Sequence, residues 1–464
     1  NFKETKKVLE KKYKFKSHSD TEVVLYAYQE WGEKCLEKFN GMFSFVIYDR
    51  RKKLLFGARD RLGQKPLKYY FDNNVFIFAS EIKAILALLK STPDIDPIAI
   101  DDFLTLQYVP APRTGFKHIY KLPPAHYFIY RNKKLSVHRY WSLNFQKKLV
   151  LAKEDWQDLI FSELKRAVMT HMVSDVPVGA LLSGGLDSSL IVALMCKNSR
   201  QRIHTFSIGF DDEKFDETRY AKMVSDMYGT RHKQLRVHSS DLLMHVKHLA
   251  RYFDEPLADN SMLPTFLVSQ MAGKYVKVAL TGDGGDENFG GYDRYAYVKL
   301  RHVLSKIGVN ALGGARFLAD GLLTVKPSRL ADRASRFISS IGGEFYTKYV
   351  LYNSFFPDQV KHDLYTDDFT HTVAGHDTKE LYKKFFDPRL EDVDNALNID
   401  MHTYLPDDLL YKSDAASMAH SLELRAPFLD HEFIEKTAAM PAGLKINLWG
   451  NKKMILKDIA HKYN

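Results

Sequence analysis

The chain has 464 residues, of which 45% are hydrophobic and 27% are charged. This length is several times what one hydrophobic core requires, so two or more domains are expected. The composition is that of an ordinary globular protein, and no stretch approaches the roughly 18 consecutive apolar residues of a membrane-spanning helix. We therefore expect a soluble protein without a membrane partner.

The charge balance is mildly basic. Lys and Arg number 67 against 57 Asp and Glu, which gives a formal net charge of +10. This excess fits a polyanionic small ligand as well as it fits nucleic acid. The one dense run of lysines, between Lys3 and Lys16, has the spacing of the solvent face of a helix around Val8 and Leu9. We therefore expect no nucleic-acid partner.

Two cysteines, Cys35 and Cys196, lie far apart in the sequence and match no metal-ligand spacing. Each lies in an amphipathic helical pattern, which predicts small core residues in a reducing, cytoplasmic compartment. The sequence begins at Asn1 with neither an initiator methionine nor a signal sequence. This start is expected to be a cut within a longer chain.

The first part of the chain shows a helix followed by short strands. Helical apolar spacing over residues 21–39 gives way to the alternation of a β-hairpin, with its turn at 49–52. Further strands are expected at 68–71, 75–79, 116–120 and 126–130, with one helix at 80–89. This pattern predicts an antiparallel α+β domain.

The strand pattern stops near residues 140–142, and a polar stretch leads into a long helix over 156–172. We therefore expect one domain over residues 1–145 and a second over 146–464. In the second, buried strands alternate with helices, which predicts a parallel α/β sheet. The expected strands are 178–182, 204–210, 233–237 and 276–281, and the expected helices are 188–197 and 218–228. After Tyr292 the pattern is almost wholly helical.

A glycine-rich turn with the sequence SGGLDSS, residues 183–189, connects the strand at 178–182 to the next helix. Phosphates bind at such turns, because glycine lets the backbone approach the ligand and the helix N-terminus favours an anion. Its three serine hydroxyls can add hydrogen bonds, and Asp187 can hold the Mg²⁺ that accompanies a polyphosphate. The turn matches neither the Walker pattern nor GxGxxG. The alternative is a turn that merely connects strand and helix.

This turn resembles the pyrophosphatase loop of the N-type ATP pyrophosphatases, which cleave ATP to AMP and pyrophosphate. A second glycine-rich segment, TGDGGDENFGGY at residues 281–292, follows another buried strand and places three carboxylates at a sheet edge. It resembles the second signature of the asparagine synthetases. With both segments present, the chain is identified as similar to that family, and a helical C-terminal region is expected after the ATP-pyrophosphatase domain.

The resemblance implies roles for the matched positions. Asp187 and Asp286 are expected to bind Mg²⁺ with pyrophosphate, and Asp283 to take part in forming an acyl-adenylate. The best-known members carry Glu at the position of Asp283, which leaves the identity of the acceptor open. Lys453 matches the lysine that contacts the phosphates. The residues expected to bind ATP are Leu182, Ser183, Gly184, Gly185, Asp187, Ser188, Ile208, Thr281, Gly282 and Tyr292.

Three further segments resemble family positions around the acid substrate. Residues 405–430 are similar to the helical segment that closes over the acid, and residues 254–256 and 259–261 resemble positions near it. Their assignment depends on the family. Taken by itself, Lys453 would be an ordinary surface residue, so its assignment also depends on the family.

Segments at 19–22, 40–45, 59–67 and 79–84 resemble the class II glutamine amidotransferase domain, which implies a partial Ntn-hydrolase-like antiparallel sandwich. In that family Asp20 would bind the α-amino group of glutamine; taken by itself, an Asp at a loop-to-helix junction is an N-cap. The family's nucleophile is an N-terminal cysteine that would lie upstream of Asn1, so this stretch is not expected to hydrolyse glutamine. The C-terminal end is likewise expected to be incomplete.

The expected function is that of an ATP-dependent amide-forming ligase. ATP and Mg²⁺ would adenylate the side-chain carboxylate of aspartate to β-aspartyl-AMP, and ammonia, from glutamine in the intact protein, would give asparagine and AMP. Two alternatives stay open: the same chemistry on another carboxylate, such as a sugar acid of a surface polysaccharide, or a non-catalytic nucleotide-binding regulatory protein. A homodimer is one assembly open to such an enzyme.

Overall fold

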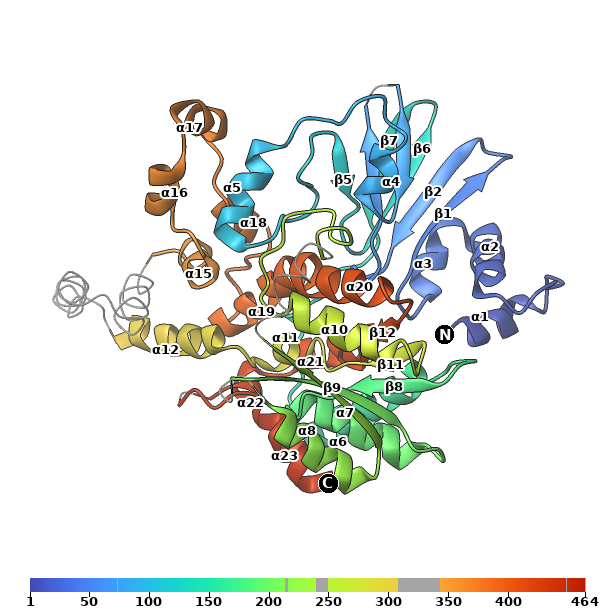
Figure 1. Cartoon of the computed structure of the whole chain (residues 1–464), viewed down its shortest axis with the longest axis vertical. Coiled ribbons are helices and arrows are strands. Elements are labelled where there is room, and N and C mark those ends of the chain that lie inside the picture. The colour runs from blue at the N-terminus through green and yellow to red at the C-terminus, as the bar shows by residue number, and fades with distance from the viewer. Residues whose placement is uncertain (73, 213–215, 239–248, 308–342, 448, 464) are drawn as a thin grey trace.

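The computed structural model describes residues 1–464 except 73, 213–215, 239–248, 308–342, 448 and 464. It is a mixed α/β structure with antiparallel sheets in the N-terminal part and a parallel sheet with helices later in the chain (Figure 1). The N-terminal sheets lie in the upper part of the view and the parallel sheet in the lower part. No described helix is both long and apolar enough to cross a lipid bilayer.

The N-terminal part contains two antiparallel sheets preceded by helices. The four-stranded sheet has the order β1 (Ser44–Asp49), β2 (Leu54–Arg59), β6 (His126–Arg131), β7 (Lys134–Arg139). The three-stranded sheet has the order β4 (Phe76–Ala79), β3 (Lys68–Phe71), β5 (Ile119–Lys121). The helices of this part are α1 (Phe2–Leu9), α2 (Asp20–Trp31), α3 (Cys35–Lys38), α4 (Ile82–Leu86) and α5 (Pro97–Leu106).

The predicted hairpin is confirmed by β1 and β2, whose register pairs Asp49 with Leu54. The predicted single helix over 21–39 is wrong. It ends at Trp31, because Gly32 adopts a φ of +59°, and a short 3-10 turn then leads into α3. Strand β7 was not predicted, because most of its side chains are exposed and show no apolar alternation.

The predicted parallel sheet is confirmed. Its order is β10 (Arg231–Val237), β9 (His204–Phe210), β8 (Val178–Leu181), β11 (Val278–Leu280), β12 (Glu423–Arg425), and every pairing is parallel. Helices follow its strands: α7 (Leu186–Asn198) comes after β8, α8 (Thr218–Tyr228) after β9, and α6 (Lys153–His171) precedes the sheet. The predicted alternation of strands and helices therefore holds up to β10.

Helices cover both faces of the parallel sheet. Ala180 and Leu280 share one buried core with residues of α6 and α7. Ala279, the neighbour of Leu280, shares another core with Val268 of α10 (Met262–Ala272). Because successive strand residues point to opposite faces, the central strands are apolar on both sides. The carboxyl ends of β8 and β11 lie at one edge of this sheet, where open α/β sheets bind their ligands.

After β11, the residues that the structure describes form helices, turns and one strand, β12, which was not predicted. Its three residues run parallel to β11, with Val278 opposite Glu423. A strand this short leaves no periodic signal among the helices on either side. The described helices are α11 (Gly285–Phe289), α12 (Asp293–Ile307), α15 (Phe345–Asn353), α16 (Asp358–Leu364), α17 (Asp367–Val373), α18 (Lys379–Lys383), α19 (Asp392–His402), α20 (Leu410–Met418), α21 (His431–Ala439), α22 (Ala442–Lys445) and α23 (Met454–Tyr463).

Buried ion pairs connect the N-terminal sheets to the later part of the chain. Lys68 of β3 and Lys121 of β5 each place Nζ 3.2 Å from a carboxylate oxygen of Glu255. All three side chains are at most 6% exposed. Segment 254–256, expected near the acid substrate, thus contacts the N-terminal sheets through Glu255.

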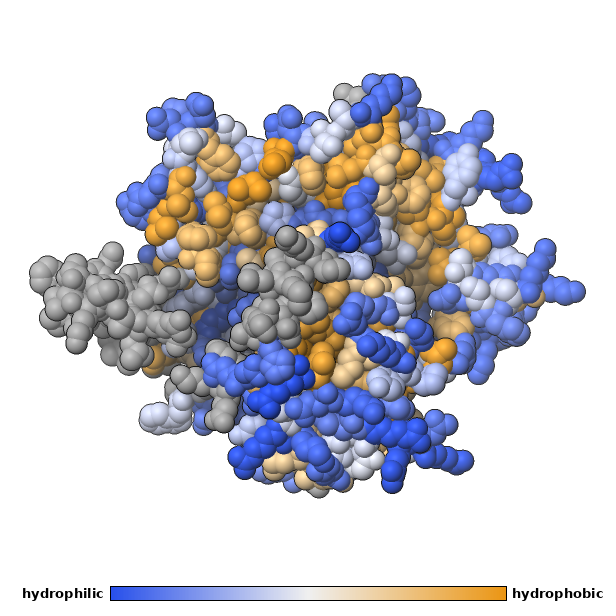
Figure 2. Space-filling model, in the orientation of Figure 1, coloured by the Kyte–Doolittle hydropathy of each residue, from blue (hydrophilic) through white to orange (hydrophobic). Residues whose placement is uncertain are grey.

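Apolar surface is distributed unevenly on the face drawn in Figure 2. Hydrophobic residues gather over the upper part, around α4 and α5, whereas the lower part, around α8, is mostly hydrophilic. Phe78, Leu88 and Ile95 are among the exposed large hydrophobic residues of the N-terminal part. The exposed apolar surface of this face therefore lies mainly in the upper part of the view.

Candidate active site

The first element of the site is the turn between β8 and α7. The buried Leu182 donates its N–H to the carbonyl of Phe206 at 2.8 Å, which prolongs the contact between β8 and β9. Gly184 has a φ of +86°, and a Cβ there would lie 2.5 Å from the backbone nitrogen of Ala221. Both its conformation and the approach of α8 therefore require glycine at this position.

Two serine hydroxyls form hydrogen bonds within the turn. Ser183 Oγ lies 3.1 Å from Ser188 Oγ and accepts the N–H of Gly185 at 3.2 Å. Gly185 is the N-cap of α7, so the amide groups that open this helix lie beside the two hydroxyls. The turn thus gathers N–H and O–H donors at a helix N-terminus, the arrangement that binds phosphate.

The second element is the segment that follows β11. A Cβ on Gly285 would lie 2.5 Å from Asp187 Cγ, and a Cβ on Gly282 would lie 3.1 Å from Asp187 Cβ. A Cβ on Gly291 would lie 1.7 Å from Asp286 Oδ1. Glycine at these positions therefore lets the two loops approach each other closely enough for Asp187 and Asp286 to share one site.

Lys453 bridges the two loops. Its Nζ forms an ion pair with Asp187 Oδ2 and lies 2.8 Å from Asp286 Oδ1. The residue directly precedes α23 and has a φ of +53°, and its side chain is 15% exposed. Three charged groups that are far apart in the sequence, at 187, 286 and 453, thus form one largely buried cluster.

Burial changes the acid–base properties of this cluster. Burial raises the pKa of Asp187 to about 6; Lys453 opposes this shift and Asp286 adds to it. Burial by itself would lower the pKa of Lys453, but the carboxylates of Asp187 and Asp286 outweigh it and raise that pKa. Lys453 is therefore a fixed cation at neutral pH, whereas Asp187 titrates just below neutrality.

The cluster has the donors that a magnesium ion requires. Asp187 Oδ1 is buried and has no hydrogen-bond partner among the residues that the structure describes. Carboxylate oxygens are the protein ligands that Mg²⁺ prefers, and the ion usually takes only one or two of them together with phosphate oxygens. Asp187 and Asp286 thus fit Mg²⁺ that arrives with a polyphosphate.

Asp283 lies at the end of β11, beside this cluster. Its Oδ2 accepts hydrogen bonds from Thr281 Oγ1 at 3.0 Å and from Ser413 Oγ at 3.2 Å. A small pocket next to it is also lined by Lys65, whose Nζ lies 2.7 Å from Asp414 Oδ1. Asp283 thus faces both α20 and the N-terminal part of the chain.

Glu287, the third carboxylate of the segment 281–292, was given no role from the sequence. It is 1% exposed, and burial, with a contribution from Asp286, raises its pKa to about 7. The hydroxyl of Tyr292 donates a hydrogen bond to it at 2.5 Å. Tyr292, expected to bind ATP, therefore also holds a buried carboxyl group next to the cluster.

A family model described as asparagine synthase matches residues 160–464, and one described as a glutamine amidotransferase domain matches residues 1–141. The chain belongs to the asparagine synthase family. Relatives cover it over nearly its whole length.

Asparagine synthetase [glutamine-hydrolyzing] 1 of Bacillus subtilis is 32% identical to the chain, covering 99% of the chain and 71% of the relative. A putative asparagine synthetase [glutamine-hydrolyzing] 2 of Methanocaldococcus jannaschii is 42% identical, covering 61% of the chain and 56% of the relative. A putative asparagine synthetase [glutamine-hydrolyzing] of Mycobacterium tuberculosis is 33% identical, covering 93% and 66%. The chain therefore spans between 56% and 71% of the length of these three relatives.

Two residues expected in the site, Asp20 and Ile208, lie outside the cluster of charged residues at 187, 286 and 453. Asp20 is the first residue of α2, is exposed, and accepts weak hydrogen bonds from Ser19 and Thr21 at 3.4 and 3.5 Å. Ser19, rather than Asp20, is the N-cap of that helix. Ile208 is half-buried on β9 and packs against the cores of the parallel sheet. The remaining expected residues lie in the two loops or beside them.

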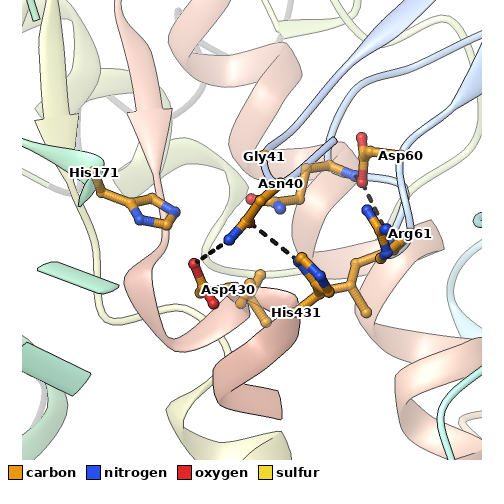
Figure 3. Close-up of a pocket in the computed structure, with 10 residues that line it drawn as sticks. Asn40, Gly41, Asp60, Arg61, His171, Asp430 and His431 are labelled. Carbon is orange, nitrogen blue, oxygen red and sulfur yellow. Dashed lines mark hydrogen bonds between the residues drawn. The ribbon is translucent and has the colours of Figure 1, made fainter. Parts of the chain in front are cut away.

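A polar contact joins the N-terminal part to the segment before α21 (Figure 3). Asn40 donates from Nδ2 to Asp430 Oδ2 at 3.3 Å, and its Oδ1 lies 3.1 Å from His431 Nδ1. Burial lowers the pKa of His431 to about 4, so the ring is neutral near pH 7 and Nδ1–H is the donor to Asn40. The adjoining cavity, which Arg61 also lines, measures about 10 Å³, the size of one water molecule.

Proposed function

We propose that the chain is the ATP-dependent synthetase part of an amide-forming ligase, joined to glutaminase-domain sequence. One observation carries this proposal: Lys453 bridges Asp187 and Asp286 beside a glycine-rich phosphate turn. The membership in the asparagine synthase family supports the same activity. We also propose that residues 1–145 form the glutaminase-type domain, an Ntn-hydrolase-like sandwich, and residues 146–464 the synthetase domain.

The proposed reaction has two steps. A carboxylate oxygen of the acid attacks the α-phosphorus of ATP, the bond to the β-phosphate oxygen breaks, and pyrophosphate leaves. Ammonia then attacks the acyl carbon of the acyl-adenylate and loses a proton. The bond between the acyl carbon and the phosphate oxygen breaks, and AMP leaves with the electron pair of that bond. The products are an amide, AMP and pyrophosphate, and no oxidant or reductant is required.

Each part of the cluster has a place in the first step. The turn residues Ser183 to Ser188 would hold the phosphates through N–H and O–H donors, and Lys453 would neutralise charge that develops on them. Mg²⁺, when bound by Asp187 and Asp286, would screen the departing pyrophosphate. Asp283, fixed by Thr281 and Ser413, would contact the acid at the acyl-adenylate stage. Leu182, Ile208, Thr281, Gly282 and Tyr292 would complete the ATP site.

The acid that best fits the family is aspartate, which would give β-aspartyl-AMP and then asparagine. A sugar acid would undergo the same chemistry, and a regulatory protein would bind ATP without releasing pyrophosphate. In the intact protein, ammonia would come from glutamine, with Asp20 binding its α-amino group.

A reducing cytoplasm suits the two free cysteines, of which Cys35 is buried. A homodimer stays a prediction that sedimentation would test.

The test is the release of pyrophosphate. The protein is incubated with Mg²⁺, ATP, ammonium and L-aspartate, and then with other carboxylic acids in place of aspartate. We expect pyrophosphate and AMP in equal amounts, in an acid-dependent reaction. ATP binding without pyrophosphate release from any acid would contradict the adenylation proposal and favour the regulatory alternative.

A further inference from the structure

A dense group of cations lies at one end of the four-stranded sheet, the end that points away from the parallel sheet (Figure 1). Two turns meet there: residues 50–53 connect β1 to β2, and residues 132–133 connect β6 to β7. Because Leu55 of β2 pairs with Tyr130 of β6, the two turns lie side by side at the same level. We call the seven cations of this end the basic rim: Arg50, Arg51, Lys52, Lys53, Arg131, Lys133 and Lys134.

The basic rim has few counter-charges. All seven of its residues are exposed. Lys52 has a described ion-pair partner, because its Nζ lies 3.9 Å from Asp49 Oδ2. Asp49 Oδ1 accepts the backbone N–H groups of Arg51 and Lys52 at 3.0 Å each, so this carboxylate also closes the turn. Among the residues that the structure describes, the other six cations form no ion pair, so their charge is available to a partner.

Two lysines of the basic rim lie in backbone conformations that favour glycine or asparagine. Lys53 has a φ of +51° and Lys133 a φ of +59°. In hairpin turns such left-handed positions are usually Gly, Asn or Asp, because a β-carbon is strained there. Asn132, with a φ of +51°, follows this preference, whereas the two lysines do not. The turns thus carry positive charge at a cost in backbone energy, which a turn that is merely solvated does not require.

The three-stranded sheet ends beside the basic rim. The ring of Phe76 in β4 stacks on that of Tyr130, with 4.5 Å between ring centres, which places the turn between β3 and β4 next to the rim. That turn contains one acidic residue, Asp72, whose Oδ1 accepts the N–H of Val75 at 2.7 Å. Val75 and Tyr48 of β1 are among the exposed large hydrophobic residues. The end of the two sheets therefore combines many cations with a few exposed apolar and aromatic side chains.

The shape of this end indicates which kind of polyanion it fits. Neighbouring strands lie about 4.8 Å apart, so the turns along the four strands form a row about 15 Å long. A row of protruding turns is convex, so it meets a flat anionic surface with many side chains at once but does not enclose an extended peptide or a nucleic-acid strand. Long Lys and Arg side chains reach lipid head groups, and a Tyr side chain suits the boundary between head groups and acyl chains. Figure 2 shows hydrophilic residues along this upper edge of the molecule.

We propose that the basic rim docks the protein on the surface of an anionic lipid bilayer. Each Lys or Arg that approaches such a surface strengthens binding about fivefold, so several together give measurable association. The formal net charge of +10 favours the same approach. This contact needs no membrane-spanning helix, and it departs from the expectation of no membrane partner, which was drawn from the lack of long apolar stretches. The inference is independent of the proposed reaction.

The test is cosedimentation of the full chain with lipid vesicles. Vesicles of phosphatidylcholine alone are compared with vesicles that also contain phosphatidylserine. Both are measured at about 0.1 M and about 1 M salt, where the Debye length is about 10 Å and about 3 Å. We expect binding to the anionic vesicles at low salt, its loss at high salt, and no binding to the neutral vesicles, because the attraction is electrostatic.

The double variant Lys53→Gly/Lys133→Gly removes two cations and both strained conformations. It creates the Asn-Gly pair that hairpin turns prefer at residues 132–133, so it should fold at least as stably as the unmodified protein. We expect its binding to anionic vesicles to be about 10- to 30-fold weaker. The matched control is Arg231→Gln/Lys233→Gln, which removes two exposed charges from β10 of the parallel sheet. The control should bind within about twofold of the unmodified protein, because these charges lie away from the basic rim.

Several results would overturn the inference. They are equal binding to neutral and anionic vesicles, no binding to anionic vesicles at low salt, and unchanged binding by the glycine variant. An equal loss of binding in the glycine variant and in the control would show an effect of net charge rather than of the basic rim, and would overturn it as well. Complete displacement from the vesicles by a single-stranded oligonucleotide or by polyglutamate, at an equal concentration of anionic groups, would overturn the choice of a bilayer as the partner.

Discussion

Lys453 Nζ lies 2.8 Å from Asp286 Oδ1, across a gap that a Cβ on Gly291 would fill. The same ammonium group forms an ion pair with Asp187. These contacts join three loops that are separated by more than 90 residues each, and they place a cation where a polyphosphate would lie.

Replacing the bridging lysine should stop adenylation. Lys453→Met keeps most of the side-chain volume and removes the charge beside Asp187 and Asp286. We expect acid-dependent pyrophosphate release to fall about 10²- to 10³-fold, as for the loss of one group that stabilises developing charge. Lys452→Met is the control, because Lys452 pairs with the exposed Asp293, and it should retain nearly full activity.

The activity should depend on pH through Asp187. Its pKa is raised to about 6, and it binds Mg²⁺ only when ionised. Pyrophosphate release should therefore decline as the pH falls through about 6. The effect of Asp187 on the free energy of unfolding has the opposite sign. Its carboxyl group binds a proton more tightly in the folded than in the unfolded protein, so protonation near pH 5 stabilises the folded state. A pH–rate profile checks the first statement, and a flat profile between pH 5 and 7 would be inconsistent with it.

The close approach of the two loops should require Gly285. Gly285→Ala places a methyl group 2.5 Å from Asp187 Cγ, so either the loop or the carboxylate must move. We expect a loss of about 1–3 kcal/mol in the free energy of unfolding and a marked loss of activity. Gly443→Ala is the matched control, because a Cβ there meets open space, and chemical denaturation should show little change.

The contact between the two parts of the chain should depend on Glu255. Glu255→Ala removes the nearer carboxylate from Lys68 and Lys121, which keep only Asp254 at 3.8 Å and Asp407 at 3.7 Å. Breaking a buried pair costs up to about 3–5 kcal/mol. The control is Glu380→Ala, which removes an exposed pair with Lys383 and should cost at most about 1 kcal/mol. Similar denaturation midpoints for the two variants would contradict a structural role for Glu255.

Sequence patterns predicted the parts of the fold that repeat regularly. The hairpin of β1 and β2 and the alternation from β8 to β10 follow from apolar periodicity, and the turn at residues 183–185 follows from its glycines and serine. Strand β12 was missed because three residues carry no period, and the helix over 21–39 was extended too far because Gly32 lies in a pattern that otherwise continues.

The site was predictable only where its residues lie in the two glycine-rich motifs. Asp187, Asp283 and Asp286 follow buried strands, which indicates ligand binding at a sheet edge. Lys453 has no such local signal, and its assignment came from the family resemblance.

The most direct test of the central claim is acid-dependent exchange of labelled pyrophosphate into ATP, measured without ammonia. Because the acyl-adenylate step is reversible, the unmodified protein with Mg²⁺ and its acid should return label to ATP, and Lys453→Met should reduce this exchange at least about 10²-fold. Two results would contradict the account. One is equal exchange by the unmodified protein and Lys453→Met, and the other is no exchange with any acid although ATP still binds.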